Sequence, residues 1–173
     1  MRSEHDFPTL SELRDFTEHR MTAQGHPATI PLSPHLAEAS TRTTSSARLA
    51  TLALLQDTEV RAAVAEHPNT ALSTLHQLAA DADWIVLGAV ARNPHTPAQD
   101  LAQVAHQAWA PSASPSSFRQ HLTTFVKMGL LQNPQTPHNV VETYGIPESD
   151  GVLRRLAERW LTRYPSAGEE AVS

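Results

Sequence analysis

The sequence predicts an all-α fold, a short α-solenoid of about five helix-pair repeats with an accessory N-terminal helix. A four-residue motif with proline at its second position, which we call the proline motif, occurs three times: His67-Pro68-Asn69-Thr70, Asn93-Pro94-His95-Thr96 and Asn133-Pro134-Gln135-Thr136. The apolar runs before the first two copies begin at Val60 and Val86, and leucines recur at the same interval, at Leu49, Leu75 and Leu101. A period of this length predicts helical units that each stack on their neighbours.

Composition narrows the function classes. The formal charge of −5 argues against non-specific nucleic-acid binding, which depends on Lys and Arg. Because the chain has no cysteine, it holds no disulfide, thiolate zinc site or iron–sulfur cluster. It has no apolar run of about 20 residues and no signal-peptide pattern. We therefore expect a cytoplasmic protein that does not enter a membrane.

Three segments are expected before the repeats: a flexible tail at 1–8, an accessory helix at 9–21 and a linker at 22–34. Thr9 and Glu12 have the spacing of a capping box, which favours a helix start. The apolar stripe of this helix consists of Leu10, Leu13 and Phe16. The stripe would dock either on this chain's own repeats or on another copy.

Within the repeat domain, at 35–164, each unit is predicted to contain a first helix, a proline turn, a second helix and an aspartate turn. Asp57 and Asp83 are placed to cap first helices. The proline of each proline motif is expected to end the first helix, because its ring does not fit a helix interior. One threonine per unit is expected to cap the second helix: Thr44, Thr70, Thr96 and Thr136.

The third copy of the proline motif is displaced from the regular repeat spacing. Thr136 lies farther from Thr96 than Thr96 lies from Thr70, so a segment has been inserted, at about 106–119. We interpret it as a loop that contains Trp109, followed by a first helix lengthened to about 115–131.

After the insertion the regular spacing resumes. Val152 and Leu156 then correspond to Val126 and Leu130, and Trp160 takes the place of a proline. The last helix is therefore expected to reach about Tyr164, with a polar tail at 165–173.

The run Val-Arg-x-Ala-Val-Ala-x-x-Pro-Asn-Thr that starts at Val60, followed by Leu-x-x-Leu-Ala and an acidic turn, resembles the leucine-rich repeat variant family. The resemblance covers about residues 35–164 and is most specific at 57–105. It implies a right-handed superhelix of short helices in two layers. It also implies a scaffold, and it transfers no catalytic residue. The unit is slightly longer than is usual for the family, and the cysteine-bound iron–sulfur segment of one member has no counterpart here.

The predicted function is a non-catalytic protein–protein interaction scaffold without a cofactor or metal. The outward side of the second helices is expected to be polar and nearly uncharged. Asp100 is expected to point outward on this side. Tryptophans at a variable turn and in the insertion are typical of partner contacts. The candidate partner-binding residues are Trp84, Trp109, His76, Gln77, Gln99 and Gln103.

Two alternatives stay open. A helical-repeat protein could bind nucleic acid through a basic face formed by Arg61, Arg92, Lys127 and Arg154. Acidic Glu59, Glu66 and Glu158 interrupt that face. The second alternative, an enzyme or metalloprotein, requires a cluster of convergent polar groups. The ten histidines include no pair at the i, i+4 spacing of a helical zinc site.

Overall fold

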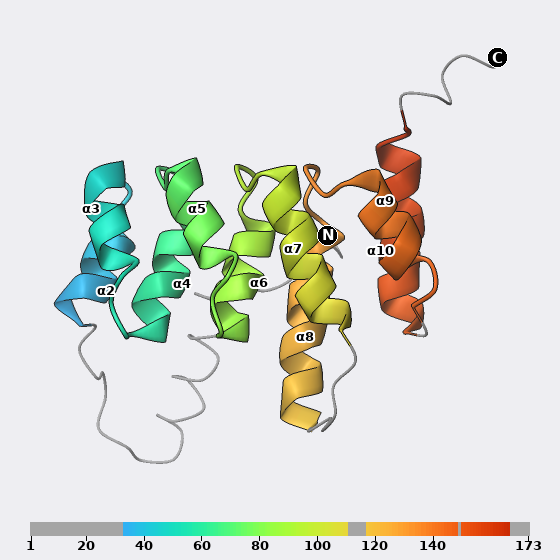
Figure 1. The fold of residues 1–173 in the computed structure, drawn as a ribbon, viewed down its shortest axis with the longest axis horizontal. Helices are drawn as coiled ribbons and strands as arrows, with labels where there is room; N and C mark the ends of the chain where they lie inside the picture. The colour runs from blue at the N-terminus through green and yellow to red at the C-terminus, as the bar shows by residue number, and fades with distance from the viewer. Residues whose placement is uncertain (1–32, 111–116, 149, 167–173) are drawn as a thin grey trace, which may run out of the picture. The chain divides into compact units, whose positions relative to one another are not determined.

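The computed structural model describes residues 33–110, 117–148 and 150–166 (Figure 1). The chain divides into two compact units, Met1–Ser33 and Pro34–Ser173. Apart from Ser33, the described residues belong to the second unit. The predicted tail at 1–8, the accessory helix at 9–21 and nearly all of the linker at 22–34 lie outside them. So do residues 167–173 of the predicted C-terminal tail.

The described residues form helices and no strand, which confirms the predicted all-α, solenoid-like fold. In chain order the elements are α2 (Pro34–Ala39), α3 (Ser46–Leu52), α4 (Thr58–Glu66), α5 (Leu72–Leu78), α6 (Trp84–Arg92), α7 (Ala98–Trp109), α8 (Ser117–Leu130), α9 (His138–Val140), the π-helix η1 (Val141–Gly145) and α10 (Gly151–Arg163).

The helices of the second unit alternate between two rows and follow one another from α2 to α10 (Figure 1). In the first row α2 packs on α4, α4 on α6 and α6 on α8, whereas α10 packs mainly on η1. In the second row α3, α5 and α7 each pack on the first helix of their own unit and on that of the next. Four helix pairs and the final helix α10 account for the five predicted units.

Valines and leucines spaced by four residues fill the first row. Val60 and Val64 of α4 are fully buried, as are their equivalents in α6, Val86 and Val90. Because α6 lies between α4 and α8, its residues 86–91 are all buried. The crossing of α6 and α8 is close: a Cβ atom on Gly88 would lie 2.4 Å from Cε1 of Phe125. Only glycine permits this approach without a shift of the ring.

Aspartates cap the first helices as the sequence predicts. The carboxylate of Asp57 accepts hydrogen bonds from the backbone N–H groups of Glu59 and Val60. Asp83 accepts from Ile85, and Asp150 caps α10 in the same way. Each cap satisfies N–H groups that have no partner inside the helix, which is worth about 1 kcal/mol.

The prediction that threonines cap the second helices was wrong. The N-caps are the residues that follow the threonines, and among them only Ser45 caps with its side chain: Ser45, Ala71, Pro97 and Pro137. Each threonine is buried and donates its hydroxyl to a carbonyl six residues earlier, at 2.5–2.6 Å.

The proline of the proline motif explains the hydrogen bond that the threonine hydroxyl donates. For Thr70 the acceptor is the carbonyl of Val64, whose ordinary helical partner would be the nitrogen of Pro68. A proline nitrogen carries no hydrogen, so the threonine hydroxyl supplies the missing donor. The same relation holds for Thr96 with Pro94 and for Thr136 with Pro134.

Neighbouring units are joined by a donor ladder, formed by the buried side chains of His67, Asn93, Asn133 and Trp160. Asn93 Nδ2 donates to the carbonyls of Ala65 and His67, at 2.7 and 3.4 Å. Asn133 Nδ2 donates to those of Ala91 and Asn93, at 2.8 and 2.9 Å. Trp160 Nε1 donates to the carbonyl of Asn133, at 2.9 Å. Each of these three donors thus reaches back to the preceding unit and satisfies a buried carbonyl there.

His67 takes the place of an asparagine in this ladder. Its Nε2 lies 2.9 Å from the carbonyl oxygen of Thr41, and its Nδ1 accepts from the backbone N–H of Asn69. Asn93 Oδ1 accepts from the N–H of His95 in the same way. These contacts assign the neutral tautomer with hydrogen on Nε2 to His67.

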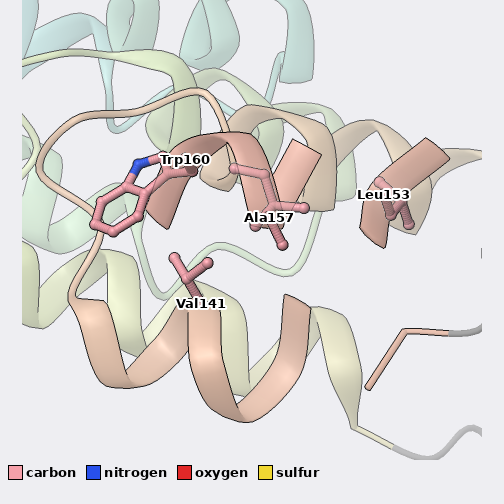
Figure 2. Close-up of a cluster of buried hydrophobic side chains, with 5 residues drawn as sticks. Val141, Leu153, Ala157 and Trp160 are labelled. Atoms are coloured by element: carbon pink, nitrogen blue, oxygen red, sulfur yellow. The ribbon is translucent and has the colours of Figure 1, made fainter. Parts of the chain in front are cut away.

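The unit that ends in η1 adds one residue to the regular spacing, so the prediction that the regular spacing resumes was wrong. The π-helix η1 adds this residue, as a single π-helical turn does. Leu153 and Ala157 are therefore buried in place of Val152 and Leu156. Trp160 corresponds to Asn133 and not to a proline. Figure 2 shows the side chains of Val141, Leu153, Ala157 and Trp160 in the core between η1 and α10.

The insertion differs from the prediction at its start. Helix α7 continues to Trp109, so this tryptophan ends a helix and does not lie in a loop. Residues 111–116 lie outside the described residues. Helix α8 agrees with the predicted long first helix and has 14 residues, against nine in α4 and in α6.

Candidate functional site

Four of the six predicted partner-binding residues lie on the second row. His76 and Gln77 belong to α5, and Gln99 and Gln103 belong to α7. All four are exposed. Gln77 and Gln103 are separated by one repeat period and occupy equivalent positions in successive units. Gln103 also donates to the carbonyl of Ala79, at 3.3 Å, which links α7 to the end of α5.

A buried carboxylate orients the His76 side chain. Nδ1 of His76 lies 2.7 Å from Oδ1 of Asp100 in the first turn of α7. The histidine side chain is 63% exposed and the aspartate side chain only 1%. Asp100 was expected to point outward, and the structure buries it instead. Its second oxygen, Oδ2, is buried without a hydrogen-bond partner, so His76 is the only side chain that binds this carboxylate among the described residues.

We call the exposed side of α3, α5 and α7 the second-row surface. Besides the histidines His76 and His106, these helices contain two residues of the types Asp, Glu, Lys and Arg, namely Arg48 and Asp100. Arg48 forms a two-pronged contact with Glu38, at 2.7 and 2.8 Å. Asp100 is buried against His76. The exposed equivalent positions carry uncharged side chains: Ala47, Ser73 and Gln99 in one line, and Thr51, Gln77 and Gln103 in the next. Leu54, in the turn after α3, and Leu72, the first residue of α5, are 66% and 58% exposed.

The two predicted tryptophan anchors are half-buried. Trp84 is the first residue of α6 and therefore belongs to the first row. Trp109 stacks on Tyr144 of η1, with ring centroids 5.4 Å apart and planes at 22°. Neither tryptophan stands out from the surface as a free aromatic side chain.

Trp109 belongs to a cluster with Lys127, Tyr144 and Glu148. Its Nε1 donates to Oε2 of Glu148 at 2.9 Å, and Lys127 Nζ lies 2.7 Å from the same oxygen. Lys127 Nζ also lies 5.0 Å from the centroid of the Trp109 ring, which is a cation–π distance. The cluster joins α7, α8 and the segment after η1. Sequence spacing does not reveal it, because its members come from two units and from separate elements within them.

The four residues of the predicted basic face are not brought together. Arg61 binds both oxygens of Asp81, at 2.7 and 3.2 Å, and donates to the carbonyls of Leu55 and Gln56. The hydrogen bond to Asp81 raises the pKa of Arg61 above its usual value. Arg92 lies over the ring of Phe125, 5.3 Å from its centroid.

Lys127 is held in the Trp109 cluster. Arg154 of α10 is exposed and pairs with Glu158, at 3.1 Å. Three of the four side chains therefore make contacts inside the fold, and the fourth is paired on the last helix.

The part of the chain that the structure describes contains no group of three or more His, Cys, Asp or Glu residues arranged to hold a metal ion. None of its helices has both the length and the apolar character needed to span a bilayer.

Comparison with known families agrees with the resemblance seen in the sequence. Residues 58–83 match the family model described as leucine rich repeat variant. The matched residues run from the start of α4 to Asp83, the cap of α6, and thus make up one complete unit. No curated protein and no solved structure matches the chain.

Proposed function

We propose that this helical-repeat protein, with its leucine rich repeat variant unit at 58–83, is a non-catalytic scaffold that binds a partner protein through the second-row surface. The proposed contact residues are the exposed polar side chains of α5 and α7: His76, Gln77, Gln99 and Gln103.

The observation that carries the proposal is the absence of an unpaired Asp, Glu, Lys or Arg side chain on this surface. Within α3, α5 and α7 the only such side chains, Arg48 and Asp100, are bound by Glu38 and by His76. The centres of protein interfaces are depleted of Lys, Glu and Asp, because burying an unpaired charge is costly. Amide and hydroxyl side chains lose less on desolvation when a partner supplies their hydrogen bonds. The second-row surface therefore suits contact with a protein.

The His76–Asp100 contact adds to this argument. A side chain that is already ordered loses little conformational entropy when a partner binds it. With Nδ1 directed at Asp100, His76 presents its other nitrogen on the exposed side of α5. In this proposal His76 is the ordered contact, and Gln77, Gln99 and Gln103 are adaptable contacts around it.

The tryptophans have other roles in the proposal. Trp109 fixes the end of α7 through Tyr144 and Glu148, and thereby supports the surface from beneath. Trp84 lies on the first row, outside the surface. The nucleic-acid alternative is less favoured, because Arg61, Arg92 and Lys127 already make contacts within the fold.

The test compares two variants with the same change of charge. Gln77→Lys with Gln103→Lys places two charges on the second-row surface. Gln56→Lys with Gln132→Lys places two charges at exposed positions outside the second-row helices. The intact chain and both variants are used to capture partners from nuclease-treated lysate, and captured proteins are purified and titrated by calorimetry.

We expect a protein that binds the intact chain and the control variant, with affinity reduced at least about tenfold by the surface variant. A partner that is lost from the control variant and retained by the surface variant would place the site elsewhere. Recovery of nucleic acid in untreated lysate, released by modest salt, would favour the basic-face alternative instead.

A further inference from the structure

A stripe of arginines runs along the exposed side of α10. Arg155, Arg159 and Arg163 are spaced by four residues, so they lie on one side of the helix. All three are exposed, whereas Leu153, Ala157 and Trp160 bury the opposite side against η1. We call these three residues the arginine stripe.

Four other cations of the fold, Arg48, Arg61, Lys127 and Arg154, are each paired with a carboxylate. In the described part of the chain no carboxylate pairs with Arg155, Arg159 or Arg163, and Arg163 lies over the ring of Tyr164 at 5.7 Å. The single acidic residue of α10, Glu158, binds Arg154 on a neighbouring line of the helix. The stripe is thus an uncompensated positive region in a chain of net charge −5.

An apolar edge accompanies the stripe. Val152 lies three residues before Arg155, on the same side of α10, and is 47% exposed. Leu156 is half-buried beside it. The one-residue shift caused by η1 leaves Val152 outside the core, whereas Leu156 still packs partly against it. The exposed side of α10 therefore offers three positive charges beside an apolar edge.

We propose that α10 docks an acidic amphipathic helix of a partner polypeptide along the arginine stripe. Positions i and i+4 of a helix are separated by about 6 Å along the axis, so carboxylates spaced by four on the partner match the arginines. Apolar residues of the same partner helix would cover Val152 and Leu156. This surface is separate from the second-row surface, so the inference does not depend on the proposed function.

Two observations favour an acidic helix over a nucleic acid as the occupant. The stripe is confined to one helix and does not continue along the array, since Arg61, Arg92 and Lys127 are engaged within the fold. In addition, the exposed Val152 gains nothing from a phosphate backbone but does gain from an apolar side chain.

The experiment measures binding of a defined peptide by fluorescence anisotropy. The probe is an acetylated, labelled 15-residue peptide of Glu and Leu, with glutamates spaced by four on one side. The stripe variant is Arg155→Gln with Arg159→Gln. The matched control is Arg42→Gln with Arg154→Gln, which removes the same charge from exposed positions outside the stripe. Circular dichroism checks that all variants keep their helix content.

The stripe variant is expected to bind the peptide about tenfold more weakly, and the control variant within about twofold of the intact chain. Val152→Asp is also expected to weaken binding, which separates docking from charge attraction alone. Equal losses in the stripe and control variants would overturn the proposal. So would equal binding of a scrambled peptide of the same composition, absence of saturable binding, or preferential binding of a 20-nucleotide single strand.

Discussion

Trp160 donates its indole N–H to the carbonyl of Asn133, 2.9 Å away, at the position where Asn133 itself donates to Asn93. An indole and a carboxamide thus perform the same task in successive units. Both are buried, and both satisfy a carbonyl of the unit before. The contact between units is therefore defined by a donated N–H and not by a residue type.

Removing one donor of the ladder should destabilise the whole array. Asn133→Ala removes the side-chain N–H donor of the buried Ala91 carbonyl, and it leaves the Asn93 carbonyl with the backbone N–H of Thr96 alone. We expect a loss of about 2–4 kcal/mol in the free energy of unfolding, measured by urea denaturation. Asn139→Ala removes an exposed asparagine and serves as the control, with a change below about 0.5 kcal/mol. Equal effects of the two substitutions would contradict the role of the ladder.

Helices α6 and α8 should not tolerate a methyl group at their crossing. In Gly88→Ala the new Cβ would lie 2.4 Å from Phe125 Cε1, so the ring must move from its place beneath Arg92. We expect destabilisation by about 1–3 kcal/mol in thermal or urea unfolding. Adding Phe125→Leu should recover most of it.

Gly151→Ala is the control for that substitution. Nothing lies within 4 Å of a Cβ atom at this position in the first turn of α10. The change should be neutral or stabilising by up to about 1 kcal/mol, because alanine restricts the unfolded chain. A loss at Gly151 as large as at Gly88 would show that backbone freedom, and not the close crossing, explains both.

The charge on Glu66 should oppose folding at neutral pH. Burial raises the pKa of Glu66, and the nearby Arg92 offsets only part of this effect. The residue also ends α4, where the helix dipole disfavours a negative charge. A raised folded-state pKa means that Glu66 stabilises the fold when protonated, and that this contribution is lost as pH rises from its unfolded-state pKa through the raised folded-state pKa.

Glu66→Gln should therefore raise the melting temperature at pH 7, with a gain that shrinks as pH falls and vanishes below about pH 4, where both side chains are neutral. Glu59→Gln is the matched control. Glu59 is exposed in the first turn of the same helix, where a carboxylate is favourable, so no gain is expected. A gain for Glu66→Gln that persisted in acid would rule out titration as its cause.

The parts of the fold that could be predicted are those with a repeated residue type. Asp57 and Asp83 cap helices, and Val60 and Val86 are buried, because each position keeps one kind of side chain from unit to unit. The helical class and the long helix after the insertion follow from the same regularity.

Two predictions were wrong, the register of the last helix and the threonine caps. In each case the same residues fit two alignments of the repeats or two hydrogen-bonding roles. Val152 and Leu153 are both apolar, so an array shifted by one residue looks equally regular in sequence; the π-helix decides between them. A threonine at a turn suits either a cap or a bond to an earlier carbonyl. The missing N–H of Pro68 favours the second, a signal that was present in the sequence.

Part of the candidate site could be predicted from the sequence. The exposure of Gln77 and Gln103 follows from the helical period. The contact of His76 with Asp100 joins side chains in different units, so it depends on how the units are offset in space. Trp109 was misplaced because nothing in the sequence marks the end of α7 before it.

The donor ladder also has a direction along the chain. Asn93 binds carbonyls of residues 65 and 67, Asn133 those of 91 and 93, and Trp160 that of 133, so every acceptor precedes its donor. During synthesis, which proceeds from the N-terminus, each donor emerges from the ribosome after the carbonyl that it binds. A newly made turn therefore always meets a finished one, and the stack can assemble in the order in which it is translated.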